Sequence, residues 1–416
     1  MTENQNEKVP VKAILAALDT GGYDAETSID ELEELAKTAN AETVARVIQK
    51  RPSADSATVL GEGKIEELAE LAKNLGAELV VFDTELTASE IRNIEDIVNV
   101  RVIDRTMLIL DIFAGRAVSN EGKLQVELAQ LRYRLPRLMG IGRSLSRLGG
   151  GIGTRGPGEK QLETDRRHIR RRIEKLESEL KELESRRSFS RSRRKKDNVL
   201  TAAIVGYTNV GKSTLLNRLT GAGVLAEDKL FATLDLTSRA IELPDGRSVT
   251  LIDTVGLIRR LPHHLVEAFR STLEEAANAD IILHVSDISD PEAKDKTLTA
   301  EKLLADLGCG GIPVINVLNK ADSVDYKIPE NDTTVCISAK TGAGIDRLLE
   351  LIAKNLPESA KKMKLMIPYD KAGFSAEIRV LGKVLSEEYT ENGILTEALV
   401  DKTLVSKAEQ FPAPKV

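Results

Sequence analysis

The sequence predicts a multidomain α/β protein. A length of 416 residues is more than one ordinary hydrophobic core needs, so about two to four domains are expected. Short apolar runs alternate with amphipathic segments over residues 1–110 and again from Leu200 onward, which is typical of parallel sheets covered by helices. Between these regions, apolar residues recur at steps of three and four, which indicates long paired helices.

An N-terminal α/β domain is expected over residues 1–110. Its first apolar run is Val11 to Leu18, and no phosphate-binding fingerprint follows that run. Gly61 to Lys64 stands beside a helix start but lacks the spacing of a phosphate loop, so we interpret it as a turn and helix N-cap. The other expected elements are helices at 29–37, 64–75 and 88–97 and strands or apolar runs at 43–48, 79–82 and 100–103.

A helical hairpin with a basic tip is expected over residues 111–197. Two heptad seams flank the segment RSLSRLGGGIGTRGPGEKQLE, whose Gly and Arg content predicts a loop rather than a helix. A flexible linker could have this composition, but the matched seams favour an antiparallel hairpin. The run from Arg186 to Asp197 breaks the periodicity and is predicted to be an exposed linker. The seams consist of Leu124, Leu128, Leu131, Leu135 and Leu138, and of Ile169, Ile173, Leu176, Leu180 and Leu183.

Composition narrows the possible partners and the compartment. The formal net charge of −6 conceals a basic stretch from Arg132 to Lys196, which predicts a local basic surface. With no Trp and 3% aromatic residues, a surface that stacks on nucleic-acid bases is not expected, and any such binding would rest on charge. Cys309 and Cys336 lack metal-ligand spacing, so reduced thiols are expected. Since no signal-peptide pattern and no apolar run of about 18 residues is present, we expect a cytoplasmic protein without a membrane span.

A phosphate-binding loop is the most specific local motif. The apolar run Leu200 to Val205 leads into GYTNVGKS, Gly206 to Ser213, and then into the helical sequence TLLNRL, which is the context that a P-loop requires. The glycines let backbone N–H groups turn toward phosphates. Lys212 is expected to reach the β- and γ-phosphates, and the Ser213 hydroxyl is expected to bind Mg²⁺.

Two later motifs predict that the base is guanine. The apolar run Pro313 to Leu318 ends in NKAD, Asn319 to Asp322, which resembles the guanine-reading motif of GTPases. A carboxylate at Asp322 would accept hydrogen bonds from the guanine ring N–H and exocyclic amine, which adenine does not offer in that arrangement. The sequence Ser338-Ala339-Lys340 looks like the last guanine-contacting loop.

The residues that would sense the γ-phosphate lie between these motifs. An apolar run ends in Asp253-Thr254-Val255-Gly256, where the carboxylate would act on Mg²⁺ through water and the Gly256 N–H would donate to the γ-phosphate. Thr233, in FATLD, suits a mobile threonine that closes on Mg²⁺ and the γ-phosphate, although an ordinary polar loop residue is the alternative.

Two further residues bear on catalysis. Leu257 stands where Ras-like enzymes place a water-orienting Gln, so slow intrinsic hydrolysis is expected. Asn209 matches the P-loop asparagine of GTPases that use K⁺ as an added charge, although Asn is also a common loop residue. The candidate catalytic residues are Lys212, Thr233 and Gly256, and the candidate metal ligands are Ser213, Thr233 and Asp253. The candidate nucleotide-binding residues are Gly206, Tyr207, Thr208, Asn209, Val210, Gly211, Lys212, Ser213, Thr214, Phe231, Ala232, Thr233, Leu234, Asp253, Thr254, Val255, Gly256, Asn319, Lys320, Asp322, Ser338, Ala339 and Lys340.

With these motifs and the upstream segment SRLGGGIGTRGPGEKQLETDRR, the chain resembles the HflX family of translation-associated GTPases over essentially its whole length. Leu257 departs from the Phe that is usual in that family, and an apolar replacement keeps the expectation of slow turnover. The resemblance implies a GTPase domain at 198–358 and a small α+β domain at 359–416. It also implies Mg²⁺ with GTP or GDP; ATP binding by the N-terminal domain is suspected in the family, but no adequate motif is present.

The resemblance further implies a partner, the large ribosomal subunit, with the tip from Arg143 to Lys160 near the peptidyl-transferase region and GTP-dependent splitting or rescue of stalled ribosomes. Basic side chains on and near the hairpin could neutralise rRNA phosphates. A large-subunit assembly GTPase and a ribosome-occluding hibernation or antibiotic-protection factor are the alternatives, and a monomer is expected. These side chains are Arg132, Arg134, Arg137, Arg143, Arg147, Arg155 and Lys160.

Overall fold

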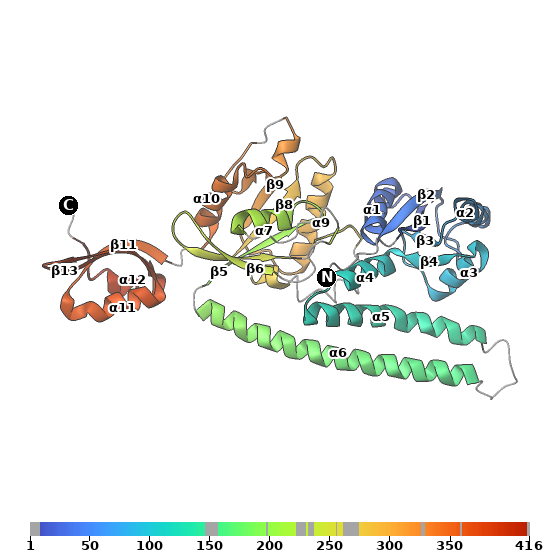
Figure 1. Cartoon of the computed structure of the whole chain (residues 1–416), viewed down its shortest axis with the longest axis horizontal. Coiled ribbons are helices and arrows are strands. Elements are labelled where there is room, and N and C mark those ends of the chain that lie inside the picture. The colour runs from blue at the N-terminus through green and yellow to red at the C-terminus, as the bar shows by residue number, and fades with distance from the viewer. Residues whose placement is uncertain are drawn as a thin grey trace, which may run out of the picture. The chain divides into compact units, whose positions relative to one another are not determined.

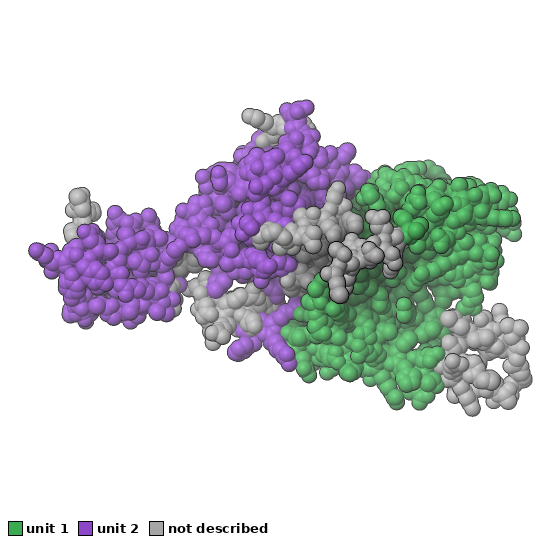
Figure 2. Space-filling view, viewed as in Figure 1, with its two compact units in different colours: residues 1–184, 227–235, 258–270 green, residues 185–226, 236–257, 271–416 purple. Residues whose placement is uncertain are grey.

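The structure, a computed structural model, has the predicted multidomain α/β class, with two mainly parallel sheets and one antiparallel sheet (Figure 1). It describes residues 9–145, 157–196, 199–221, 230–231, 237–254, 256–260, 274–325, 329–357 and 360–413, and at 139–145, 157–162, 190–196, 360 and 381 only the backbone. Contacts divide the chain into two compact units (Figure 2). Unit 1 contains residues 1–184, 227–235 and 258–270, and unit 2 contains residues 185–226, 236–257 and 271–416. The four domain boundaries expected from the sequence remain predictions.

The N-terminal sheet has four parallel strands in the order β2-β1-β3-β4. Because both faces of a parallel sheet are covered, β1 and β3 are nearly continuous apolar runs, and their side chains pack with those of α2 and α3 in one core. The bounds are β1 Val11–Asp19, α1 Ala25–Thr38, β2 Ala41–Lys50, α2 Glu62–Leu75, β3 Leu79–Phe82, α3 Ala88–Val98, β4 Arg101–Asp104 and α4 Arg105–Arg116.

Local signals set the ends of these helices. The Asp24 carboxylate accepts hydrogen bonds from the first N–H groups of α1, and Thr87 forms a capping box with Glu90 at the start of α3. Gly61 is the N-cap residue of α2, so the interpretation of Gly61 to Lys64 as a turn and cap is confirmed. Asn99 ends α3 in the left-handed conformation that Asn tolerates.

The predicted hairpin consists of α5, Asn120–Leu145, and α6, Pro157–Lys196, which lie side by side (Figure 1). Both heptad seams are confirmed, because Leu128, Ile173 and Leu176 are buried against each other and the neighbouring seam residues flank them. Arg172 donates two hydrogen bonds to the Glu127 carboxylate, at 2.6 and 2.7 Å, across the pair. No helix within the described ranges is long and apolar enough to cross a membrane.

Two expectations about α6 are wrong. Residues 157–163 of the Gly-rich segment are helical, because Pro157 stands at the first helical position, where its missing N–H and fixed φ cost nothing. Residues 186–196 continue α6 instead of forming a linker. The Arg, Lys and Ser residues there contain no Gly or Pro to end the helix, and the charge pattern indicated exposure rather than loss of helix.

The second sheet has the order β10-β9-β8-β5-β7-β6, and all its pairings are parallel except β6 with β7. The carboxyl ends of β5, β7 and β9 therefore lie along one edge, where the predicted nucleotide motifs begin. Cys309 and Cys336 are free thiols, as predicted. The bounds are β5 Leu200–Gly206, α7 Lys212–Thr220, β6 Thr237–Glu242, β7 Ser248–Asp253, β8 Ile281–Asp287, α9 Ala293–Asp306, β9 Val314–Asn319, the 3₁₀ turn η1 Ala321–Ser323, β10 Thr334–Cys336 and α10 Ile345–Asn355.

The C-terminal part is a small antiparallel sheet in the order β11-β13-β12 with two helices against it. The sequence from Ala376 to Glu388 also predicts a single helix, and the second half of this prediction is wrong, because α11 ends before Gly382 and the next residues form β12. A Cβ on Gly382 would lie 2.3 Å from the Leu399 carbonyl oxygen, so the chain passes too close to β13 for a helical residue with a side chain. The bounds are β11 Ala360–Ile367, η2 Tyr369–Lys371, α11 Ala372–Leu381, β12 Lys383–Thr390, β13 Gly393–Asp401 and α12 Lys402–Ala408.

A buried ionic cluster lies at the carboxyl edge of the N-terminal sheet, within unit 1. Asp83, which follows β3, accepts hydrogen bonds from Arg105 at 2.9 Å, Ser28 at 2.7 Å and Arg260 at 2.6 Å. Arg105 also pairs with Glu31 at 2.9 Å. Burial alone would lower the pKa of Arg105, but the carboxylates of Glu31 and Asp83 raise it, so the guanidinium stays charged. Arg260 stands four residues after Gly256 in the sequence and is part of this cluster in unit 1.

Candidate functional site

The P-loop joins β5 to α7, and its backbone leaves no room for larger residues. A Cβ on Gly206 would lie 2.2 Å from the Val285 carbonyl oxygen, and Gly211 has φ +90. Asn209 also has a positive φ of 61, a conformation in which Asn is enriched, and this explains its identity without reference to an ion. The predicted strand–loop–helix context is confirmed.

Lys212 is the buried charge of this loop. The side chain is 7% exposed, and Nζ donates to the Tyr207 carbonyl oxygen at 2.7 Å, so the loop curls around its own lysine. Burial lowers the pKa of Lys212 to about 8, while the nearby Asp253 carboxylate opposes this shift. A buried ammonium at the N-terminus of α7 suits an anionic ligand.

Ser213 and Asp253 meet as the sequence predicts for a metal site. The Ser213 hydroxyl lies 3.1 Å from Oδ2 of Asp253, and that carboxylate is buried at the end of β7. Thr254, the next residue, donates its hydroxyl to the Ile204 carbonyl oxygen at 2.8 Å, which ties the end of β7 to β5. A hydroxyl and a carboxylate next to a phosphate-binding loop are the hard oxygen donors that Mg²⁺ prefers, so the residues present fit this metal.

The turn after Asp253 lies directly on the P-loop. Leu257 forms a β-bridge with Tyr207, in which its N–H donates to Gly206 at 3.1 Å and its carbonyl accepts from Thr208 at 2.8 Å. A Cβ on Gly256 would lie 2.7 Å from Cγ2 of Thr208, so only glycine fits this approach. The Leu257 side chain is 3% exposed and packs in the core, and it offers no group that could orient water.

The motifs predicted to read guanine converge on the other end of the P-loop. The Asn319 amide donates to the Val210 carbonyl at 2.8 Å and accepts from the Ala339 N–H at 2.9 Å, so one side chain joins three segments. Lys320 has φ 63 and pairs with Asp287 at 2.6 Å. The hydroxyl of Ser338 donates to Asp322 and thereby lowers the pKa of this carboxylate, which keeps it ionised as a hydrogen-bond acceptor.

Other predicted residues belong to unit 1, have no resolved role in the site, or lie outside the described residues. The Phe231 ring is buried against Phe113 of α4, with centroids 4.6 Å apart and planes at 81°. Thr214 lies in the first turn of α7 and is half-buried. Ala232, Thr233, Leu234 and Val255 lie outside the described residues, so the expected roles of Thr233 stay predictions.

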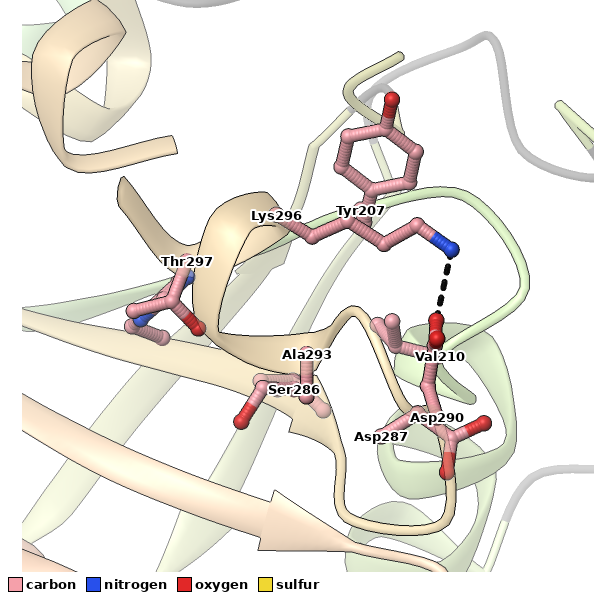
Figure 3. Close-up of a pocket in the computed structure, with 10 residues that line it drawn as sticks. Tyr207, Val210, Ser286, Asp287, Asp290, Ala293, Lys296 and Thr297 are labelled. Carbon is pink, nitrogen blue, oxygen red and sulfur yellow. Dashed lines mark hydrogen bonds and ion pairs between the residues drawn. The ribbon is translucent and has the colours of Figure 1, made fainter. Parts of the chain in front are cut away.

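A small pocket beside the P-loop was not predicted. It lies between Tyr207 and the start of α9, where Lys296 pairs with Asp290 at 2.6 Å (Figure 3). The Lys296 ammonium also lies 5.4 Å from the Tyr207 ring centroid. His284 lines the same pocket, and burial lowers the pKa of its imidazole. Tyr207 belongs to the P-loop, but His284, Asp290 and Lys296 belong to no motif, so local spacing contained no signal for them.

The site combines a P-loop with a buried lysine, a hydroxyl–carboxylate pair, and an NKxD motif whose Asn319 is hydrogen-bonded to the P-loop. These features define a P-loop GTPase, an enzyme that hydrolyses GTP to GDP and phosphate. Residues 26–114 match the family described as GTP-binding GTPase N-terminal, residues 116–194 match GTP-binding GTPase Middle Region, and residues 201–320 match 50S ribosome-binding GTPase.

The relatives define the family more closely. GTPase HflX of Caldanaerobacter subterraneus subsp. tengcongensis is 51% identical over 96% of this chain and 93% of its own length. GTPase HflX of Lacrimispora saccharolytica is 51% identical over 96% and 95%, and that of Escherichia coli K12 is 42% identical over 88% and 87%. The chain belongs to the GTPase HflX family, which confirms the resemblance found in the sequence.

The lowered pKa of Lys212 predicts a pH dependence of nucleotide binding. Below about pH 8 the buried Lys212 ammonium is charged and can bind phosphates. Above about pH 8 the lysine is neutral in the nucleotide-free protein, so it must take up a proton when the protein binds a nucleotide. The affinity for GDP is therefore expected to fall as the pH rises from 7.5 to about 8.5, a range below the titration of a normal lysine. Isothermal titration in two buffers with different ionisation enthalpies would measure the proton uptake, and equal heats in both buffers throughout the range would contradict this prediction.

Proposed function

We propose that this GTPase binds the large ribosomal subunit and uses GTP to dissociate or rescue stalled or idle ribosomes. The observation that carries the proposal is the match of residues 201–320 to the family described as 50S ribosome-binding GTPase, within a chain that belongs to the HflX family. The basic hairpin is the second support, because ribosomal RNA is a dense array of phosphates.

The hairpin contributes an exposed basic surface to this proposal. Arg134 on α5 and Arg167, Arg170 and Arg171 on α6 are exposed to solvent. The apolar seam holds the two helices together, so these guanidinium groups stand on a stiff support. Such a surface would bind RNA through phosphates and helix shape rather than through base stacking.

Two arginines expected to contact rRNA have partners inside unit 1 instead. Arg137 donates to the buried Asp104 carboxylate at 3.1 Å and to the Leu86 carbonyl at 2.7 Å, and it stacks on the Tyr133 ring. Arg132 pairs with Glu177 of α6 at 2.9 Å. Arg137 therefore joins α5 to the N-terminal sheet, and its guanidinium is engaged within unit 1. The side chains of the predicted tip, Arg143 to Lys160, lie outside the described residues.

The tip is the part whose removal tests the ribosomal role. Replacement of Gly149–Gly158 with a neutral linker of equal length is expected to leave GDP affinity unchanged, since the P-loop is untouched, and to slow ribosome splitting by at least about tenfold through lost phosphate contacts. Light scattering of 70S particles with GTP would measure splitting. Lys402→Ala, an exposed change on α12, is the control and should split normally. Normal splitting by the linker variant would remove the tip from the mechanism.

Within the GTPase site, each residue has a proposed role. Lys212 would bind the β- and γ-phosphates with its ammonium, and Gly256 would donate its N–H to the γ-phosphate. Ser213, Asp253 and Thr233 would hold Mg²⁺, which supplies positive charge to the phosphates when bound. Asn319, Asp322 and the Ser338–Lys340 loop would read guanine.

Hydrolysis needs a group that this chain lacks at the usual position. The buried Leu257 side chain cannot orient water, so we propose that the ribosome completes the catalytic arrangement. K⁺ bound near Asn209 is a second possible source of charge, although the positive φ of this residue explains an Asn equally well. Both ideas are tested by hydrolysis rates, compared with and without large subunits and in K⁺ and Na⁺ buffers.

A further inference from the structure

Arg218 connects the phosphate end of the GTPase site to the base end. It stands in the last turn of α7, the helix that begins at Lys212 of the P-loop. Its Nε donates to the Ala339 carbonyl at 3.1 Å, and its Nη2 donates to the Lys340 carbonyl. One guanidinium therefore binds two successive carbonyls of the Ser338–Lys340 loop, which arises more than a hundred residues later in the chain.

The same loop is held on its other side by the NKxD motif. The Ala339 N–H donates to the Asn319 amide oxygen at 2.9 Å, and the Ser338 hydroxyl donates to Asp322. The turn closes on itself, because the Gly342 N–H donates to the Ser338 carbonyl at 2.8 Å and Gly342 has φ +93. The Ser338–Lys340 loop is therefore held by hydrogen bonds within its own turn and by the NKxD motif. Arg218 adds a third attachment, from the helix that follows the P-loop.

Because of peptide geometry, a contact to the carbonyl groups of this loop also determines where the backbone N–H groups that follow them point. A trans peptide is planar, with its carbonyl and N–H on opposite sides. Fixing the Ala339 carbonyl on the guanidinium therefore fixes the direction of the Lys340 N–H, and fixing the Lys340 carbonyl does the same for Thr341. Backbone N–H groups distinguish purines by geometry, because guanine has an acceptor at O6 where adenine has an amine donor.

We propose that Arg218 is a positioning residue for guanine recognition, which orients the Lys340 N–H toward O6 of the base, since the Ser338 and Ala339 N–H groups donate to the Ala343 carbonyl and to Asn319. This inference rests on the proposed assignment of that loop to guanine. Arg suits the task better than Lys, because its planar fork can hold two carbonyls at fixed angles, whereas an ammonium acts as a point charge.

The test compares two ligands that differ at O6. Arg218→Met keeps much of the side-chain volume and removes the donors, and it is expected to weaken GDP binding about tenfold, the equivalent of one oriented hydrogen bond. The diphosphate of 2-aminopurine riboside lacks O6, so its Kd should change by less than about twofold. In hydrolysis assays KM for GTP should rise with kcat little changed, because the phosphate groups are untouched.

Two further variants separate positioning from folding. Arg218→Lys keeps the charge and should fall between wild type and Arg218→Met in GDP affinity, and it remains informative if the Met variant is unstable. Arg347→Met removes an exposed arginine on α10 that pairs only locally with Glu350, and it should bind both ligands as wild type does.

The outcomes are distinct. Equal weakening of both ligands by Arg218→Met, or no weakening of either, would overturn the role of Arg218 alone. If the wild-type protein itself binds GDP and the 2-aminopurine analogue equally, the assignment of Ser338–Lys340 to O6 is wrong. We expect Arg218→Met to weaken the binding of GDP more than that of the analogue. We expect the GDP affinity of Arg218→Lys to lie between those of Arg218→Met and the wild type.

Discussion

Replacing Lys212 with alanine is expected to reduce GTP hydrolysis by about 100- to 1000-fold, the loss that follows removal of one charged group aimed at the reacting phosphates. The ammonium is buried in the P-loop, and the side chains of Lys320 and Lys296 are engaged in ion pairs with Asp287 and Asp290. Single-turnover hydrolysis with radiolabelled GTP would measure the rate.

The stability of the same variant provides an independent check. Because burial lowers the pKa of Lys212, the folded nucleotide-free protein is less stable with this lysine charged, and that cost is fully present below about pH 8. Lys212→Ala should therefore unfold at the same or a higher temperature than wild type without nucleotide, while losing most of the stabilisation by GDP. Lys302→Ala, exposed on α9, is the control. A variant that loses activity together with nucleotide-free stability would show misfolding instead.

Replacing Asp83 with alanine is expected to destabilise unit 1 by about 3–5 kcal/mol, because it removes the partner of a buried charge. The side chains of Asp83 and Arg105 are 0% and 3% exposed, so water cannot take over the lost contacts, and Ser28 loses its acceptor as well. Urea unfolding followed by circular dichroism would measure the free energy. Hydrogen exchange in β3 and α4 would identify the part that opens.

A matched control variant separates the effect of burying an ion pair from the effect of removing a carboxylate. Asp30→Ala also removes a carboxylate bonded to an arginine, but that pair with Arg46 is exposed, and its loss should cost less than about 1 kcal/mol. The double variant Asp83→Leu with Arg105→Met should recover part of the stability, since the two most buried charges of the cluster are then both removed. Equal effects of the Asp30 and Asp83 changes would contradict the buried cluster.

Local pattern predicted most of the fold and the core of the site. The run Leu79 to Phe82 is apolar throughout and forms a buried strand. The glycines of the P-loop around Lys212 lie where neighbouring backbone or side-chain atoms approach too closely for a larger residue. The heptad seams were predicted for the same reason, because spacing along one helix determines which side chains share a face. These features depend on residues that are close in sequence, so they can be predicted from one amino-acid sequence.

The parts that sequence reasoning missed depend on distant partners. Asp83 and Arg260 are 177 residues apart, and Arg218 binds a loop 121 residues further along the chain, so neither pair has local spacing. Residues 186–196 were wrongly predicted to form a linker. Their many charged side chains indicate that the segment is exposed to solvent, but an exposed segment can still be helical. The assignment of Phe231 to the nucleotide stays a prediction, whereas the packing of its ring on Phe113 within unit 1 joins residues too distant in sequence for local spacing to reveal.

The central claim is that the ribosome completes the GTPase site of this HflX-family protein. The most direct measurement is GTP hydrolysis by the purified protein with and without large ribosomal subunits, in K⁺ buffer and again in Na⁺ buffer. We predict stimulation of at least about tenfold by the subunits, since Leu257 leaves the water without an orienting group. Faster rates in K⁺ would support an ion near Asn209, and equal rates in both buffers would exclude it. Tight binding to the subunit without any stimulation would contradict the claim and favour a factor that simply occludes the ribosome.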